Sequence, residues 1–215
     1  MADLTTYKGL CAAVAEWLGR DDLEAQIPTF IQLAERRMNR ELRLRVMERR
    51  AVSTVDAGDL GASLPNRREP GAWDVFLEMR DVAWRTPDNM VSPMTYMPPD
   101  HYRGAVMKSG TPQQYTIIGD KIFFSSVPDT PADLLLTYYA EIPPLGKEQP
   151  TNEVLLTAPD VYLYATLTEA GPYTRGSAPV EQWAQFYGAA KQKLEHSEQR
   201  ARFTSNLTMR PTRRI

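Results

Sequence analysis

The stretch IPTFIQLAERRMNREL, residues 27–42, carries the strongest structural signal in this chain. Its apolar side chains recur every three or four residues, which is the spacing of one face of an α-helix. That face consists of Ile27, Phe30, Ile31, Ala34, Met38 and Leu42. Pro28 suits the first turn, where its missing N–H costs nothing. We therefore expect a helix that runs to about Met47, with Asp21-Asp22 as the N-cap.

Toward the N-terminus, residues 5–19 show the same helical spacing. Gly19 fits the end of this first helix. Cys11, the single cysteine of the chain, lies in the pattern and is expected to be a small buried residue. The apolar face holds Leu10, Val14, Trp17 and Leu18.

Toward the C-terminus, two further helices are predicted. Thr157 and Asp160 have the spacing of a capping box, and Gly171 stops the helix that they open. Ser177 and Pro179 begin the last helix. Its apolar stripe consists of Val180, Trp183, Ala184, Tyr187, Ala190 and Leu194. Because no terminal segment could bury its stripe alone, we expect residues 5–47 and 155–203 to pack as one bundle, with Trp17 and Trp183 buried.

Between residues 48 and 145 the pattern changes to short strands and turns. Alternation predicts a half-buried strand at residues 75–80 and another at residues 134–138. Gly119-Asp120 has the form of a two-residue hairpin turn between strands at residues 115–118 and 121–125. Prolines are frequent throughout this region, which favours short strands and long loops over a long helix.

The expected fold class is α+β, with a helical bundle built from the N- and C-terminal helices. A β-rich insertion separates those helices, and an extended tail follows them. The predicted parts are residues 1–47, 48–150, 151–203 and 204–215. Such an arrangement lets each helical stripe bury against another layer.

The composition offers little chemistry. A net charge of −2 over 215 residues points to neither a nucleic acid nor a membrane, and no apolar run approaches the ~20 residues of a membrane span. His101 and His196 are the only histidines, and neither stands in a metal-binding or catalytic pattern. We therefore nominate no catalytic, cofactor-binding or metal-binding residue, and expect a protein that is not an enzyme.

Candidate contact residues are arginines and one aromatic residue. The second helix carries Arg36, Arg37, Arg40 and Arg43, which suit an interface or a channel wall. Acids interleaved with them, including Glu41 at the spacing of an ion pair with Arg45, weaken the case for a nucleic-acid helix. Phe186 falls off the stripe of the last helix and is the candidate for a second contact face.

The C-terminal segment differs from the rest of the chain. Residues 199–215 contain five arginines and no acid, and Pro211 breaks any helix there. A segment of this kind has little apolar surface to bury and is expected to be extended or dependent on a partner. Its candidate partner-binding residues are Arg210, Arg213, Arg214 and Ile215.

Several motifs resemble the head–tail adaptor proteins of tailed bacteriophages. They are TYKGL and VAEWL at residues 6–10 and 14–18, IPTFIQLAERR at residues 27–37, YYAEIPPL at residues 138–145 and PDVYLYA at residues 159–165. The order of helices, strands and helices is similar too. The resemblance covers both ends of the chain and the last predicted strand, whereas residues 51–131 match only in strand pattern.

The resemblance implies a structural protein of the virion, made in the host cytoplasm and placed at the head–tail junction. Adaptors of this family form a ring of about twelve copies that docks on the portal, extends the DNA channel and carries the next tail or nozzle protein. The expected partners are therefore the portal, that tail protein and other copies of the chain. The C-terminal residues would dock on the portal, with DNA in the channel as an alternative contact.

Two other functions stay open from the sequence. One is a neighbouring stopper or tail-completion protein, further from the portal. The other is a nucleic-acid-binding module that uses the arginine-rich helix or tail. Binding of that second kind should weaken steeply as salt rises.

Overall fold

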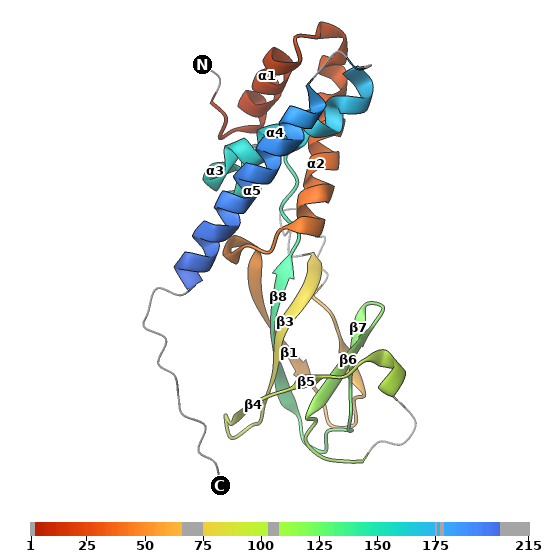
Figure 1. Ribbon diagram of the computed structural model, residues 1–215. Helices are drawn as coiled ribbons and strands as arrows, with labels where there is room; N and C mark the ends of the chain where they lie inside the picture. The colour runs from red at the N-terminus through yellow and green to blue at the C-terminus, as the bar shows by residue number, and fades with distance from the viewer. Residues whose placement is uncertain (1–2, 66–74, 103–107, 175, 177–178, 203–215) are drawn as a thin grey trace. The chain divides into compact units, whose positions relative to one another are not determined.

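The computed structural model describes residues 3–65, 75–102, 108–174, 176 and 179–202. The chain is α+β, as predicted, and its helices and strands separate into two compact units (Figure 1). One unit lies within residues 1–46 and 142–215, and the other within residues 47–141. Residues 142–150, which we expected in the β-rich insertion, belong to the first unit.

The first unit is helical. Its α-helices are α1 (Tyr7–Leu18), α2 (Ile27–Glu41), α3 (Glu153–Thr157), α4 (Pro159–Ala170) and α5 (Val180–Arg202). Short 3-10 helices are η1 (Asp21–Gln26), η2 (Arg45–Met47), at the border between the units, and η4 (Gly171–Thr174). Helices from both ends of the chain pack together, because α4 contacts α1, α2 and α5.

Helix α4 is the centre of this unit. Seven of its twelve residues are buried, including Tyr162 and Leu167. A helix that is buried around most of its circumference needs neighbours on several sides, and α1, α2 and α5 supply them. Its least buried stripe runs along Asp160, Tyr164 and Thr168.

The predicted stripe of α2 is confirmed, since all six of its apolar residues are buried. The helix ends at Glu41, however, so the expected end near Met47 is wrong: Leu42 already has extended backbone angles, with φ −99° and ψ 143°. The expected cap is also wrong. Asp21 and Asp22 lie in the first turn of η1, and Gln26 precedes α2 without a capping side chain.

Helix α1 ends where its sequence predicts, but it begins at Tyr7, two residues after the expected start. The Thr6 hydroxyl accepts a hydrogen bond from the Gly9 amide at 3.1 Å, and Gly19 takes the left-handed φ of 59°. Leu10 and Val14 are buried, but the prediction for Trp17 is wrong because 45% of its surface is exposed. Trp183 of α5 is 3% exposed, as expected.

The start of α4 also differs from the prediction. Thr157 is the last residue of the short helix α3 and does not cap α4. The Asn152 side chain caps α3 instead, by accepting a hydrogen bond from the Leu155 amide at 2.8 Å. Helix α4 ends at Ala170, immediately before the predicted stop at Gly171.

The second unit contains two four-stranded sheets. The first has the order β1 (Glu48–Val55), β8 (Ala132–Ala140), β3 (Phe76–Arg85) and β4 (Val91–Pro93), with every neighbouring pair antiparallel. The second has the order β2 (Gly61–Ser63), β7 (Lys121–Phe124), β6 (Gln114–Ile118) and β5 (Thr95–Tyr96). A short 3-10 helix, η3 (Pro99–His101), follows β5.

Both sheets contribute to one apolar core. Trp84 of β3 meets Phe124 of β7 edge to face, with ring centroids 5.5 Å apart. Leu134 and Leu136 of β8 are buried, as their alternation predicted. The hairpin is confirmed as well, because Ile118 pairs with Lys121 across a turn in which Gly119 has φ 64°.

Candidate functional site

The predicted contact residues fall into two groups. Arg210, Arg213, Arg214 and Ile215 lie outside the residues that the structure describes. The arginines of the second predicted helix and Phe186 all lie in the helical unit.

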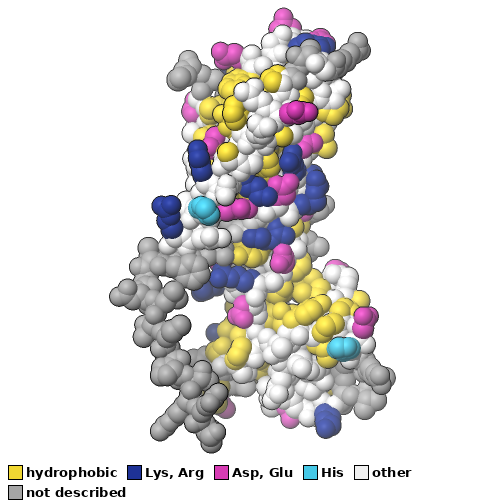
Figure 2. Space-filling model, in the orientation of Figure 1, with side chains coloured by type: hydrophobic (Ala, Val, Ile, Leu, Met, Phe, Trp, Pro, Cys, Tyr) yellow, Lys and Arg dark blue, Asp and Glu magenta, His cyan; other side chains and the backbone are white. Residues whose placement is uncertain are grey.

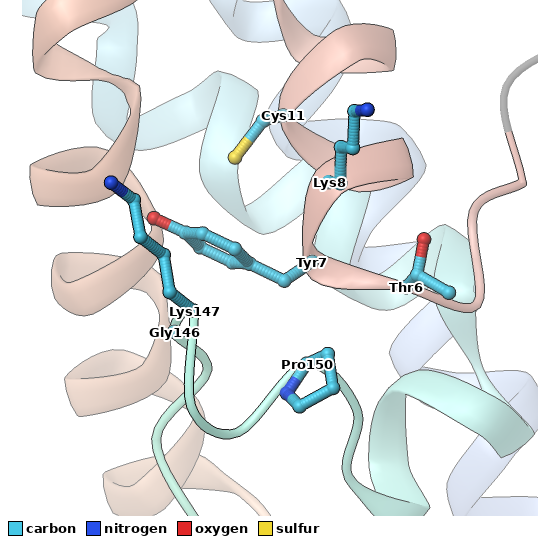
Figure 3. A pocket seen from close by; sticks show the side chains of 7 residues that line it. All are labelled: Thr6, Tyr7, Lys8, Cys11, Gly146, Lys147 and Pro150. Atoms are coloured by element: carbon cyan, nitrogen blue, oxygen red, sulfur yellow. The ribbon is translucent and has the colours of Figure 1, made fainter.

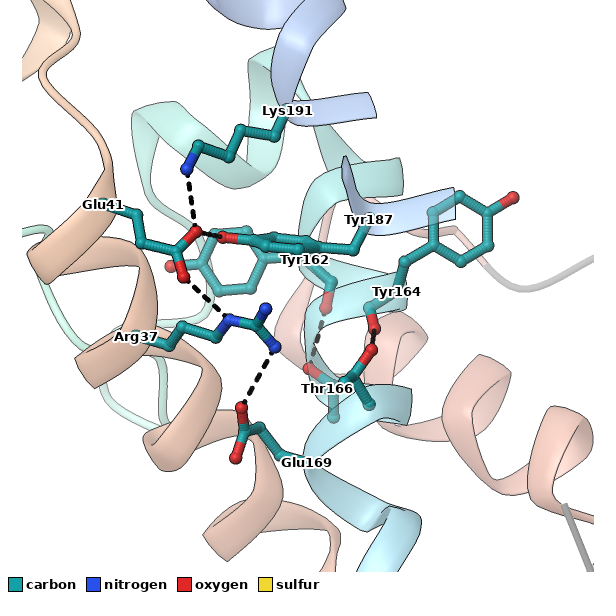
Figure 4. Close-up of polar contacts among 9 residues, drawn as sticks. Arg37, Glu41, Tyr162, Tyr164, Thr166, Glu169, Tyr187 and Lys191 are labelled. Carbon is teal, nitrogen blue, oxygen red and sulfur yellow. Dashed lines mark hydrogen bonds and ion pairs between the residues drawn. The ribbon is translucent and has the colours of Figure 1, made fainter. Parts of the chain in front are cut away.

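Arg37 of α2 points into the helical unit. Its Nε donates to Glu41 Oε1 at 2.9 Å, and one terminal nitrogen lies 3.5 Å from Glu169 of α4. The guanidinium carbon also lies 4.5 Å from the centre of the Tyr187 ring of α5, a cation–π contact (Figure 4). Arg37 therefore joins three helices of its own unit.

Glu41 receives a second and a third donor from α5. Tyr187 Oη donates to Glu41 Oε2 at 3.0 Å, and Lys191 Nζ donates to the same oxygen at 2.9 Å. Partial burial raises the pKa of Glu41, but the hydrogen bonds from Lys191, Arg37 and Tyr187 outweigh burial and lower the pKa to about 2.

The expected Glu41–Arg45 pair is absent from the described residues. Arg45 instead contacts Glu198 near the end of α5, where its Nε lies 3.4 Å from the carboxylate and its amide donates at 2.8 Å. Charged residues of α2 and its continuation thus pair both within α2, as Arg37 does with Glu41, and across helices with α5, as Glu41 and Arg45 do.

Arg43 stabilises the end of α2. Its guanidinium donates to the carbonyl oxygens of Asn39 at 2.9 Å and Leu42 at 2.6 Å, which have no partner further along the helix. Arg36 and Arg40, in contrast, have exposed side chains on the outer side of α2. The four predicted arginines are therefore divided between internal contacts and the surface.

A buried polar cluster, Glu35, Asn39, Asn152 and Tyr162, went unrecognised in the sequence. Glu35 Oε1 accepts from the Leu145 amide at 2.7 Å and from Tyr162 Oη at 3.3 Å. Asn39 Oδ1 accepts from the Ile142 amide at 2.8 Å. The available signal was the i,i+4 spacing of Glu35 and Asn39 beside the apolar stripe of α2.

This cluster fixes the segment that leads into α3. Asn152 Nδ2 donates to Tyr162 Oη at 2.6 Å and to the Pro143 carbonyl at 2.8 Å. Two backbone amides and one carbonyl of residues 142–145 are thereby satisfied by side chains, which an irregular buried segment requires. Burial raises the pKa of Glu35 to about 7, although the Leu145 amide and Tyr162 hydroxyl bonds oppose the rise.

A cavity of about 400 Å³ lies between α1 and the loop at residues 146–150. Figure 3 shows the Tyr7 ring reaching from α1 toward Lys147, with the Cys11 sulfur above the ring. The lining of the cavity is mainly apolar. Cys11, which we expected to be buried, is only partly buried, and this partial burial raises the pKa of its thiol and disfavours the reactive thiolate. Neither Glu35 nor Glu41 lines this cavity.

The surface of the helical unit is apolar in places. Trp17, Tyr164 and Phe186 form a chain of aromatic contacts, with centroid distances of 5.9 Å and 5.2 Å. Phe186 is 37% exposed, so its side chain is open to a partner while it also packs against Tyr164. Figure 2 shows hydrophobic side chains gathered where α1, α4 and α5 lie in Figure 1, beside a band of mixed charges.

The described residues thus form stabilising networks and an open apolar surface. Within them, no three His, Cys, Asp or Glu side chains are grouped to hold a metal ion. No described helix is long and apolar enough to cross a membrane.

Comparison with known families gives one match. The family model described as SU10 adaptor protein matches residues 5–213, which include both compact units. No curated protein matches the chain.

Proposed function

Because this chain belongs to the SU10 adaptor protein family, a phage head–tail adaptor family, we propose that it forms the ring beneath the portal. In that position it extends the DNA channel and carries the next tail or nozzle protein. It is made in the host cytoplasm and becomes part of the virion at the head–tail junction. Other copies of the chain, about twelve in all, complete the ring.

The match over residues 5–213 is the observation that carries this proposal. It spans the helical unit and the β-rich unit, so the resemblance is not limited to one common helical motif. The internal contacts support a structural role, because α2, α4 and α5 are joined by Arg37, Glu41 and Lys191. A support that transmits load between assemblies needs helices fixed in this way.

The proposed role is not catalytic. The strongly shifted carboxyl groups, Glu35 and Glu41, are engaged by donors of the same unit. Perturbed carboxyl groups also occur in structural networks, and their enclosure by helices α2, α4 and α5 fits that explanation. Glu41→Gln should therefore change stability without abolishing assembly.

The C-terminal segment is proposed as the portal contact. Arg210, Arg213 and Arg214 provide planar donors for carboxylates in a groove of the portal, and Ile215 adds an apolar side chain. DNA in the channel is the alternative contact for this arginine-rich segment. Of the four arginines on the second predicted helix, Arg37 and Arg43 make internal contacts, so that helix has a weaker basic surface than its sequence suggested.

Imaging tests the proposal directly. Purified chain is mixed with DNA-free portal protein, and the complexes are viewed by negative-stain electron microscopy. We expect an additional ring below the portal whose symmetry follows the copies of this chain. A chain that leaves the portal bare but binds to tail components would instead be a stopper or tail-completion protein.

A further inference from the structure

The helical unit carries exposed apolar side chains on two sides. We call Trp17, Tyr164 and Phe186 the aromatic face, which lies on α1, α4 and α5. Leu33 of α2 and Tyr173 of η4 form the second surface, called the α2 face. Leu33 is 42% exposed and Tyr173 is 46% exposed. Large side chains left open to this degree are candidates for protein contacts.

The aromatic face lies over the least buried stripe of α4, where Tyr164 is half-buried. The Tyr164 ring contacts the Trp17 ring of α1 and the Phe186 ring of α5. The three rings stabilise one another, since tilted and edge-to-face pairs at 5–6 Å are favourable. They form a preorganised surface, in which little side-chain freedom remains to be lost on binding.

The two faces point in opposite directions. Tyr162 and Glu169 of α4 contact Glu35 and Arg37 of α2, so that side of α4 faces α2. Tyr164 comes two residues after Tyr162, about 200° around the helix, and therefore points away from α2. Figure 4 shows Tyr164 turned away from Arg37 and Glu169.

Leu33 lies on the far side of α2. It is in line with the exposed Arg36 and Arg40 and lies opposite the buried Ile31 and Glu35. Tyr173 packs on Phe30 of the same helix, with ring centroids 4.8 Å apart. The aromatic face and the α2 face thus bound the helical unit on opposite sides, with α4 and α2 between them.

Charged residues of opposite sign lie beside Tyr164 and beside Leu33. Asp160 is exposed and lies one turn before Tyr164 on the same stripe of α4. Arg40 is exposed and lies seven residues after Leu33, on the same side of α2. Asp160 and Arg40 can therefore pair across a contact between the two faces.

We propose that the aromatic face of one copy docks on the α2 face of the next copy. A cyclic ring is built from heterologous contacts, which need two different surfaces on each subunit. One external partner would need only one surface, whereas this unit has two that are opposed in direction. Tryptophan, tyrosine and arginine are also the residues that dominate binding at interfaces. The inference rests on the proposed ring function and specifies its subunit contact.

Two double variants test the contact on the portal. One carries Trp17→Ser and Phe186→Ser, and the other carries Leu33→Ser and Tyr173→Ser. Portals are mixed with too little protein to fill them, and the copies bound to each portal are counted by native mass spectrometry. Wild-type protein should give portals that are either bare or fully ringed, because neighbours stabilise one another. Both variants should give partly filled portals and need about tenfold more protein for half-filling.

The matched control is Met90→Ser, which removes a 72% exposed apolar side chain from the β-rich unit. It should fill portals as wild-type protein does, and circular dichroism should show unchanged helix content in all three variants. All-or-none filling by either double variant would overturn the proposed pairing. Failure of wild-type protein to bind the portal would instead contradict the ring function.

Crosslinking tests the pairing without the portal. Arg40→Cys and Asp160→Cys are made separately, each together with Cys11→Ser, and treated with a short bis-maleimide alone and as a mixture. We expect crosslinked dimers chiefly in the mixture, because residue 40 of one copy should approach residue 160 of another. Equal crosslinking in the separate samples would show that each face meets itself, or meets at random, and would overturn the inference.

Discussion

At the scale of single residues, two glutamates of α2 have opposite electrostatic roles. Glu35 is buried beside Tyr162 and the amide of Leu145, and its pKa rises to about 7. Glu41 meets Arg37, Lys191 and the Tyr187 hydroxyl, and its pKa falls to about 2. For Glu35 the loss of solvation has the larger effect on the pKa, because the surrounding cluster provides only neutral donors. For Glu41 the two cations, Arg37 and Lys191, have the larger effect and lower the pKa.

Glu35 should make the protein less stable as the pH rises from about 4.5 to 7. Its folded pKa lies above its unfolded value, so its contribution is complete below pH 4.5 and is lost as the pH rises through about 7. The effect should be at most about 3 kcal/mol. Glu35→Gln should remove it, which urea unfolding at pH 5 and pH 8 would measure. An unchanged pH dependence would contradict the proposed burial of the charge.

Glu41 should act in the opposite direction. Its folded pKa lies below its unfolded value, so its contribution is present above pH 4.5 and is lost as the pH falls toward 2. Because the carboxyl is partly exposed, solvent screening reduces the expected effect to about 1 kcal/mol. Urea unfolding of Glu41→Gln at pH 7 and pH 3 tests this, with the exposed Glu24→Gln as the control. Equal acid sensitivity of wild type and Glu41→Gln would refute it.

At the scale of elements, periodicity predicted which face of α2 is buried but not where that helix ends. The stripe from Ile27 to Leu42 was readable because its spacing belongs to the helix itself. The end at Glu41 depends on the Arg43 side chain, which reaches back to the carbonyl oxygens of Asn39 and Leu42. Contacts of this kind are set by tertiary structure, which a local pattern does not contain.

Trp17 illustrates the same limit. Its position on the apolar face of α1 was correctly predicted, but burial requires a neighbour on that side. Tyr164 of α4 supplies only an edge contact, and 45% of the Trp17 surface stays exposed. The buried cluster at Glu35 was missed for a related reason, since its partner Leu145 is distant in sequence and contributes only its amide.

The two tryptophans should therefore differ in their importance for stability. Trp183→Ala should lower the free energy of unfolding by about 3–5 kcal/mol, because the side chain is almost completely buried. Trp17→Ala should cost about 1–2 kcal/mol, since much of its surface already contacts solvent. Thermal and urea unfolding of the two variants would measure the difference. Equal losses would show that Trp17 is buried in the folded chain in solution.

At the scale of the whole molecule, the family could be recognised from the sequence, whereas the contact residues could be placed only in part. The motifs at residues 6–18, 27–37, 138–145 and 159–165 come from both compact units, and the family match covers residues 5–213. Arg37 and Arg43 show why residue type alone does not define a surface. Each satisfies acceptors within its own unit, and only the folded arrangement reveals this.

The C-terminal segment should determine portal binding. A chain truncated after Phe203 keeps every helix of the helical unit, so its circular dichroism and unfolding should match those of the full chain. It should nevertheless fail to bind DNA-free portals, because Arg210, Arg213 and Arg214 are absent. Full-length chain with these arginines changed to Ala should bind weakly too, whereas Arg200→Ala, on the exposed side of α5, should bind normally. Normal binding of the truncated chain to DNA-free portals would disprove portal docking. A loss seen only with DNA-filled portals would show that these arginines contact DNA in the channel, since that contact requires phosphates and weakens with salt.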